Sequence, residues 1–223
     1  LPAGPEEGGE VAHRASLPPF RPVQPGPRAT RITPAFLRRR DRRTVAAMTN
    51  TTTTTALQLA PGRWDLDPNH SSVGFTIRHL GVSKVRGHFR TFTVDAVVGP
   101  TLEATSVSAE IDVASIDTGI ADRDAHVLSA DILDVAQRPT LSFRSTSVSL
   151  EAIEGELTLG DVTQPITLEV DFGGTAEFPA DGSVHAGFEA RGQLHLRDFG
   201  IGTFGMGDMV KLELDVQLVA PPT

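Results

Sequence analysis

The feature that most constrains this chain of 223 residues is a two-residue alternation of apolar and polar side chains, which dominates from Trp64 onward. Successive residues of a β-strand point to opposite faces of a sheet. Strict alternation therefore predicts strands with one buried face and one solvated face. The clearest segments are 73–77, 107–113, 141–144, 166–172, 186–195 and 210–218, and shorter candidates lie at 85–98 and 153–159.

About eight strands joined mostly by short turns predict an all-β fold, an antiparallel meander that closes as a barrel or a sandwich. The longest connection, 115–139, breaks the alternation. Val127, Leu128, Ile132 and Leu133 fall there at near-helical spacing, and Pro139 ends the pattern. We expect one or two short helices in this connection, packed over an end of the barrel.

The interior of such a barrel has two interpretations. An eight-stranded barrel is either filled by side chains or holds one small ligand. Small residues share the inward parity of the strands and favour a cavity, although they also fit the curvature of a filled barrel. They are Ala109, Gly155, Ala186, Ala190 and Gly192.

The first part of the chain differs in composition from the rest. Residues 1–47 contain nine Arg, no Lys and four acidic residues, whereas 48–223 contain 11 basic and 24 acidic residues, a net charge of −13. A segment rich in Arg and Pro with few aromatic residues cannot bury enough apolar surface to fold. We therefore expect a disordered leader at 1–60 and one folded domain at 61–221. Met48, the first Met, is a candidate start of translation.

Composition and charge argue against several classes of function. Nucleic-acid binding needs a basic face, which the acidic body does not offer. No stretch reaches the roughly 18 apolar residues of a membrane span, and the segment after the basic run 38–43 is too polar for a signal peptide. Cysteine is absent, which excludes disulfides and thiolate chemistry. We expect a soluble, cytoplasmic protein with no nucleic-acid partner and no stable membrane insertion.

Motifs for catalysis, cofactors and metals give no positive signal. Residues 200–205, GIGTFG, match G-x-G-x-x-G, but a strand pattern follows where a dinucleotide site needs a helix. A glycine-rich loop is the better interpretation. The histidines and the pair Asp122 and Asp124 lack metal-ligand spacing, and no G-x-S-x-G occurs. The sequence predicts no catalytic residue, no metal site, no cofactor and no enzyme activity.

Two segments each contain an Arg-Asp pair: DRDAH at 122–126 and RDFG at 197–200. Carboxylates beside an arginine suit a structural ion pair better than a general acid. Buried charges need partners, so we expect Arg123 and Asp124 to pair with Arg197 and Asp198. The alternative is that each pair is solvated.

Several successive segments resemble signatures of one family, the YceI-like, polyisoprenoid-binding proteins. They are WDLDPNHSSVGFTIRHL (64–80), RGHFRTF (86–92), IDVASIDTGIADRDAHVLSADILDVAQRPTLSFRS (111–145), GELTLGDVTQPITLEV (155–170) and RDFGI (197–201). The resemblance covers roughly 64–219. It implies an extended, eight-stranded, lipocalin-like antiparallel barrel with a long apolar tunnel for a polyisoprenoid chain, such as a prenyl quinone or prenyl phosphate. It implies no catalytic activity, and it is compatible with a homodimer. Two departures lie near the expected tunnel end: Leu196 replaces a common Asn, and DILD (131–134) lacks the family's aromatic residues.

The resemblance assigns the inward-facing side chains to the tunnel wall. The residues expected to contact the hydrocarbon chain are Phe75, Ile77, Phe89, Ile111, Leu141, Phe143, Leu157, Phe188, Phe199, Leu212 and Leu214. His79, Arg123 and His126 are expected at the polar end, where Arg123 and His126 either anchor the helical connection or contact the headgroup.

Three hypotheses remain open on the sequence. The first is a non-catalytic carrier that binds, transports or sequesters a polyisoprenoid or similar amphiphile. The second is a filled barrel without lipid that acts as a stress-linked interaction protein. The third is an enzyme acting on a bound prenyl compound, for which His79 and His126 are the only candidate titrating groups.

Overall fold

A computed structural model describes residues 59–203 and 205–222. The expectation of a disordered leader and the candidate start Met48 lie outside the described residues, apart from Leu59 and Ala60. Leu59 packs against a buried cluster around Trp64, and the carbonyl of Ala60 accepts a hydrogen bond of 2.9 Å from Trp64 Nε1.

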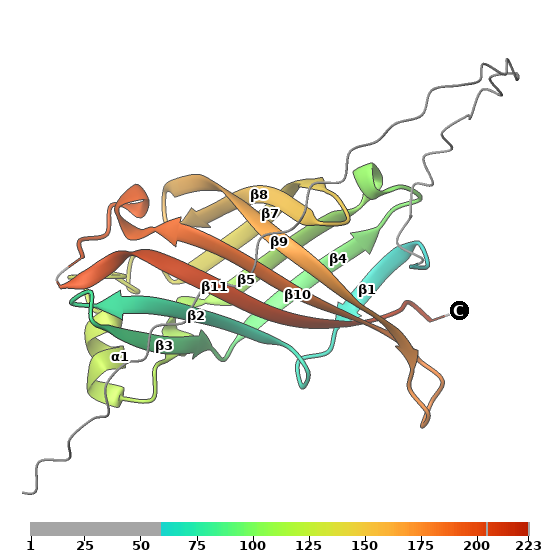
Figure 1. Ribbon diagram of the computed structural model, residues 1–223, viewed down its shortest axis with the longest axis horizontal. Helices are drawn as coiled ribbons and strands as arrows, with labels where there is room; N and C mark the ends of the chain where they lie inside the picture. The colour runs from blue at the N-terminus through green and yellow to red at the C-terminus, as the bar shows by residue number, and fades with distance from the viewer. Residues whose placement is uncertain (1–58, 204, 223) are drawn as a thin grey trace, which may run out of the picture. The chain divides into compact units, whose positions relative to one another are not determined.

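Eight antiparallel strands form a closed ring, which confirms the predicted barrel (Figure 1). Each strand pairs with its neighbour around the ring, and β1 also pairs with β11, so the sheet closes on itself. In order around the ring the strands are β1 (Gly62–Leu66), β4 (Phe92–Val98), β5 (Ser106–Asp112), β7 (Thr140–Val148), β8 (Ala152–Leu159), β9 (Val162–Glu177), β10 (Val184–His195) and β11 (Met206–Val219).

Three further strands extend the barrel toward one end. They are β2 (Ser72–His79), β3 (Ser83–Phe89) and β6 (Ile116–Asp117). β11 is long enough to pair with β1 near its C-terminal end, where Leu66 lies opposite Leu218, and with β2 earlier, where Phe75 lies opposite Leu212. β3 pairs with β2, and β6 pairs with the end of β3.

The strand register places the apolar residues of neighbouring strands on one face, as the alternation predicts. Phe143 lies opposite Ala109 on one side and opposite Leu157 on the other. These cross-strand neighbours belong to a buried apolar cluster inside the barrel. Inward-facing positions therefore form a continuous apolar wall, and the outward positions carry the charges of the acidic body.

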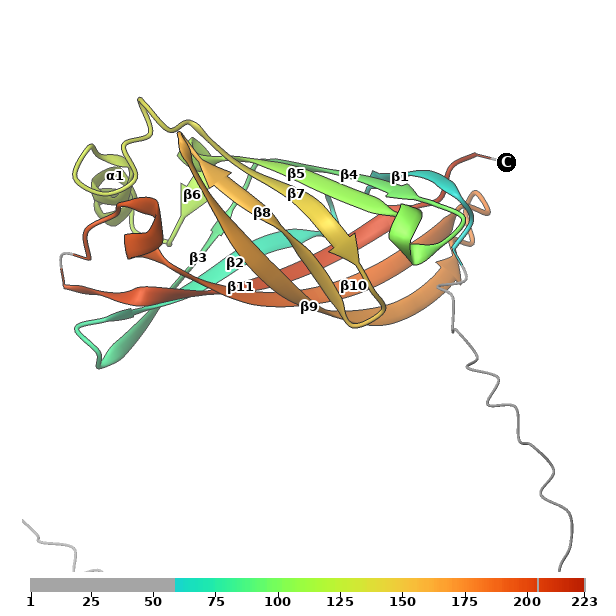
Figure 2. The ribbon, with the colours of Figure 1, turned by 90° about the horizontal axis from the view of Figure 1, so that it is seen from above.

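The long connection contains one α-helix, α1 (Ala121–Leu128), which confirms the expected short helix. Figures 1 and 2 show α1 at the same end of the barrel as the turn between β2 and β3. The chain also makes single turns of 3₁₀ helix at η1 (Leu102–Ala104), η2 (Val113–Ser115) and η3 (Leu196–Phe199).

The described residues of the glycine-rich segment, 200–203 and 205, form no helix or strand and precede β11, as their sequence context predicts. Gly200 adopts the left-handed conformation at the end of η3, with φ of 71°. Glycine suits this position because it has no Cβ to clash with the following carbonyl. No helix N-terminus follows, so the segment offers no phosphate site of the dinucleotide-binding type.

Candidate ligand-binding cavity

The barrel interior contains two adjoining apolar chambers. The helix-end chamber has a volume of about 270 Å³ and is lined in part by side chains of α1. The far chamber has a volume of about 260 Å³ and extends toward β1 and η1. Four side chains line both chambers and mark their junction: Phe89, Leu141, Leu157 and Leu212. The two spaces therefore follow β11, from Met206 beside the helix-end chamber to Leu218 beside the far one.

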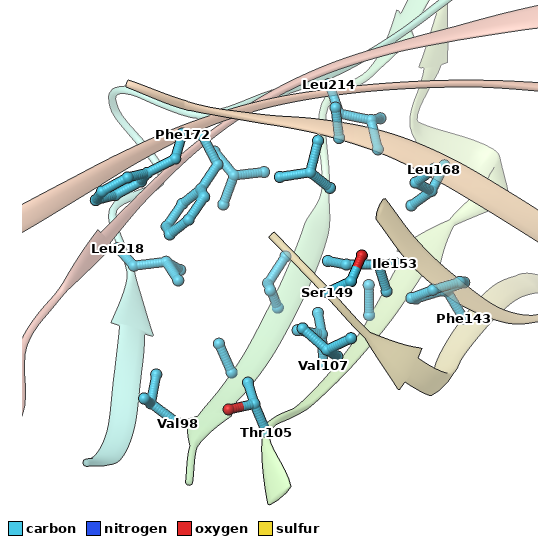
Figure 3. A pocket seen from close by; sticks show the side chains of 18 of the residues that line it. Val98, Thr105, Val107, Phe143, Ser149, Ile153, Leu168, Phe172, Leu214 and Leu218 are labelled. Atoms are coloured by element: carbon cyan, nitrogen blue, oxygen red, sulfur yellow. The ribbon is translucent and has the colours of Figure 1, made fainter. Parts of the chain in front are cut away.

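The far chamber is almost entirely hydrocarbon (Figure 3). Within the described part of the chain, no charged side chain lines it, and its only hydroxyl groups belong to Thr101, Thr105 and Ser149. Figure 3 shows side chains from several strands, among them Val107, Phe143 and Leu168, directed into one common space. Such a lining suits a long hydrocarbon and disfavours a polar metabolite.

Inward-facing glycines let two aromatic rings lie against the chamber walls. A Cβ added at Gly87 would lie 2.4 Å from Cζ of Phe75, and one at Gly155 would lie 2.4 Å from Cε2 of Phe143. Each ring thus occupies the space that a larger neighbouring residue would fill. Because the rings lie over these glycines, they take less of the chamber than they otherwise would.

Polar side chains gather at the outer end of the helix-end chamber. Arg123, on α1, donates from Nε to Thr118 Oγ1 at 2.7 Å and from an Nη to the Thr118 carbonyl at 2.6 Å. Asp124 accepts from the Thr118 backbone N–H at 3.0 Å and from its hydroxyl. These contacts fix α1 to the segment after β6. A guanidinium has five N–H donors, so Thr118 does not exhaust those of Arg123.

His79 and His126 lie at the mouth of the same chamber. Both side chains line it, yet both residues are exposed to solvent. Among the described residues no carboxylate lines this chamber. The chamber therefore offers hydrogen-bond donors at one end.

The loop after α1 closes part of this end. Ile132 is buried in the apolar core, and its carbonyl accepts a hydrogen bond of 2.9 Å from an Nη of Arg138. The other Nη of Arg138 donates to the Phe199 carbonyl at 3.4 Å, which links the loop to η3. Arg138 therefore holds two segments together that are far apart in sequence.

The expected pairing between the two Arg-Asp segments is wrong. Arg197 instead donates from Nε to Asp208 at 2.6 Å, and His195 bonds the same carboxylate at 2.7 Å. The start of β11 brings Asp208 beside η3, whereas Arg123 and Asp124 find Thr118 in their own connection. Arg123, Asp124 and Arg197 thus each have a partner nearby in the fold.

One carboxylate close to the polar end has a clear electrostatic role. Asp117, in β6, accepts a hydrogen bond of 2.9 Å from Nε of Arg90, and its other oxygen accepts from the Gly119 N–H at 2.7 Å. The hydrogen bond from Arg90 is the main cause that lowers the pKa of Asp117 below its usual value. The ionised carboxylate joins the end of β3 to the segment that carries Thr118.

Every side chain predicted to contact ligand lines at least one chamber. Phe75, Ile77, His79, Arg123, His126 and Phe199 line the helix-end chamber; Ile111, Phe143, Phe188 and Leu214 line the far chamber; and Phe89, Leu141, Leu157 and Leu212 line both. Contact with a ligand remains a prediction for all of them.

Other residues of the wall are not among those predicted from the sequence. Val94, Ala96, Val107, Leu168, Val170, Val216 and Leu218 follow the same inward parity, so the alternation already contained their signal. Thr101, Leu102, Ser149 and Leu150 come from turns at the far end, where no periodic pattern exists to reveal them.

No group of three or more His, Asp or Glu side chains within 59–203 and 205–222 is arranged to hold a metal ion. In the same ranges, no helix combines the length and the hydropathy needed to cross a membrane.

The protein is thus a closed antiparallel barrel whose interior contains two adjoining apolar chambers. A family described as the YceI-like domain matches residues 64–218, well over half of the chain. The chain therefore belongs to the YceI-like family. It is similar to the Protein YceI of Salmonella arizonae, with 39% identity over 175 residues that cover 75% of this chain and 87% of the relative.

Solved structures with the same fold support this assignment. A Campylobacter jejuni YCEI protein is 25% identical with a TM-score of 0.57, and the match covers 66% of this chain and 91% of that one. A domain from Saccharophagus degradans, described as polyisoprenoid binding, is 13% identical with a TM-score of 0.51 and is covered completely, against 73% of this chain. At that identity the Saccharophagus domain shows the fold alone.

Proposed function

We propose that this protein binds a polyisoprenoid or a similar long-chain amphiphile and carries or sequesters it without chemical change. The observation that carries the proposal is the asymmetry of the cavity. One chamber has no charged side chain among the described residues, and the other has donors only at its outer end. This arrangement matches a molecule with a long hydrocarbon tail and one polar head.

The tail would dominate the affinity. Each methylene moved from water into an apolar site contributes about 0.8 kcal/mol. A chain that occupied both chambers would pass the junction at Phe89 and Leu157 and run along β11. Chemical groups on the wall are nearly uniform, so the wall selects for length and bulk of the tail more than for its detailed structure.

The head would lie at the mouth beside Arg123, His79 and His126. These side chains donate hydrogen bonds, and no carboxylate competes for them among the described lining residues. A head that accepts hydrogen bonds is therefore favoured, which includes a quinone carbonyl and a phosphate. Membership of the YceI-like family and the fold shared with a polyisoprenoid-binding domain support the same class of ligand.

The alternative of a filled barrel loses support because the interior contains two chambers of this size. An enzyme using His79 and His126 is a weaker candidate, since both histidines lie in the exposed mouth and neither has a described partner that would orient it. A cytoplasmic location, a homodimer and a link to stress remain predictions from the sequence.

The proposal can be tested by fluorescence, because Trp64 is the only tryptophan. Trp64 packs in a cluster with Ala96 and Leu218, which also line the far chamber. The tail of a prenyl quinone in this chamber is expected to change Trp64 emission in a saturable titration, because the tail would lie against the cluster that holds Trp64. A change in emission that rises linearly without saturation would contradict occupation of the chamber.

The matched variants are Phe188→Asp and Phe178→Asp. Phe188 lines the far chamber. Phe178 does not line it and is 50% exposed to solvent. Loss of a phenylalanine contact is worth about 1.5–3 kcal/mol, so Phe188→Asp should weaken quinone binding at least tenfold. Phe178→Asp should bind like the parent chain. Circular dichroism would verify that both variants remain folded, and normal binding by folded Phe188→Asp would refute the proposed site.

A further inference from the structure

The turn between β2 and β3 projects two apolar side chains into solvent. Leu80 is 66% exposed and Val82 is 81% exposed. The turn is tightly held, because the Leu80 N–H donates to the Gly205 carbonyl at 2.8 Å and the Val82 N–H donates to the His79 carbonyl at 3.1 Å. The two side chains are thus presented at a fixed tip.

The strands that carry this tip are basic, in contrast to the rest of the folded chain. Residues 68–94 contain no Asp or Glu, and they contain Arg78, Lys84, Arg86 and Arg90. The chain from 48 to 223 has a net charge of −13. This segment is therefore a local exception to the acidic character of the body.

The strand register puts these cations on the outer face. Arg78 lies opposite Lys84, and Thr76 lies between Arg86 on β3 and Lys211 on β11. All four basic residues are exposed. Arg90 is different, because it is bound to Asp117. No carboxylate forms an ion pair with Arg78, Lys84, Arg86 or Lys211 among the described residues, so their charge faces solvent.

The tip lies beside the mouth of the helix-end chamber. His79 and Val85, from the two strands next to the turn, line that chamber. Figures 1 and 2 both show the β2–β3 turn at the end of the barrel where α1 lies. The exposed apolar tip, the basic face and the polar mouth therefore occur together.

From these features we infer that the basic hairpin, defined as residues 76–86, docks on an anionic phospholipid surface. Leu80 and Val82 would enter the headgroup region while Arg78, Lys84 and Arg86 contact lipid phosphates. A few apolar side chains combined with cations suffice for interfacial binding. Two exposed side chains are far too small a patch for a specific protein interface, which needs about 1,000 Å².

The hairpin at the opposite end of the barrel provides an internal comparison. The turn between β9 and β10 also exposes an apolar residue, Phe178, but Glu177 and Asp181 flank it. Negative charge beside the tip opposes approach to anionic lipid. Docking should therefore occur at the β2–β3 end. This preference does not depend on which molecule, if any, is bound in the cavity.

The experiment uses the full chain, which has no cysteine of its own. Val82→Cys introduces a single thiol for an environment-sensitive fluorophore, and Ala180→Cys places the same label on the opposite hairpin. Each protein is mixed with vesicles of phosphatidylcholine alone or of an equimolar mixture with phosphatidylglycerol. A label at the tip reports insertion of the hairpin itself, even if the nine Arg of residues 1–47 also bind the vesicles.

We expect a blue shift at position 82 on the anionic vesicles only, with no shift at 180. Each cation near an anionic surface is worth about a fivefold change in binding. Adding Lys84→Gln and Arg86→Gln to Val82→Cys should therefore raise the half-saturating lipid concentration roughly 25-fold. Arg144→Gln, an exposed arginine on β7, is the matched control and should have no effect. Added salt should weaken the shift.

Several results would overturn the inference. One is a label at 82 that keeps its aqueous emission on anionic vesicles. Another is an equal shift at 82 and 180, or an equal shift on both kinds of vesicle. A change in oligomeric state on Leu80→Asp or Val82→Asp, found by light scattering without vesicles, would assign the tip to a protein contact instead.

Discussion

Replacement of Gly87 by alanine should narrow the helix-end chamber with little change in the rest of the barrel. The new Cβ would lie 2.4 Å from Cζ and 2.8 Å from Cε1 of Phe75, and 3.0 Å from the Asp117 carbonyl oxygen. The first two contacts are too short, so the ring of Phe75 must move. It can move inward, toward the chamber that it lines.

The expected effect of Gly87→Ala on the free energy of unfolding can be compared with its expected effect on ligand affinity. Overpacking of this kind costs about 1–3 kcal/mol, and alanine recovers about 0.5–1 kcal/mol of the free energy of unfolding that glycine loses in a strand. The net loss should therefore stay below about 2.5 kcal/mol. Exclusion of two or three methylenes from the chamber should weaken binding of a prenyl chain by about 1.6–2.4 kcal/mol, or 15- to 60-fold.

The assay is the titration of Trp64 emission with a prenyl quinone, together with thermal unfolding. Gly187→Ala is the matched control, because nothing lies within 4 Å of a Cβ at that position. We expect weaker quinone binding for Gly87→Ala and unchanged binding for Gly187→Ala. Unchanged affinity in a folded Gly87→Ala protein would refute the view that the ring over Gly87 sets the width of the chamber.

Two further predictions concern the polar end. The hydrogen bond from Arg90 lowers the pKa of Asp117 in the folded chain, so its stabilising effect is fully present above the pKa of an unfolded aspartate, about 3.9, and is lost as pH falls through the folded value. Asp117→Asn should lower Tm at neutral pH, and its difference from the parent chain should shrink below about pH 4; a difference that is constant with pH would contradict this role. Arg123→Gln should weaken binding of a prenyl quinone by about 1.5–3 kcal/mol through the lost charged hydrogen bond, without affecting a prenyl hydrocarbon that has no polar head. Equal losses for both ligands in isothermal titration would make Arg123 a structural anchor only.

The strands and most of the cavity wall could be predicted because both depend on the same local property. Side-chain alternation decides which face of a strand is apolar, and closure of the sheet turns that face inward. Alternation alone therefore places Phe143 and Leu212 in the interior, without knowledge of the strand pairing. The volume left inside was not predictable in this way, because it depends on contacts such as that of Phe143 with Gly155.

The tertiary partners of charged residues were less predictable. Asp208 reaches Arg197 because it lies at the start of β11, 11 residues after Arg197 in the chain. Alternation carries no information about that placement, so the resemblance between the two Arg-Asp segments suggested the wrong partners. β1 and β2 pair with different parts of the same strand, β11. This arrangement is also a tertiary feature, since it depends on the length of β11 relative to its neighbours.

Native mass spectrometry of the full chain purified from its source cell, followed by solvent extraction of any bound molecule, tests the lipid-binding function without added ligand. We expect a stoichiometric prenyl species that is present under native conditions and released by organic solvent. A mass equal to that of the bare chain, together with no binding of added prenyl quinone or prenyl phosphate, would contradict a lipid-binding function for this barrel.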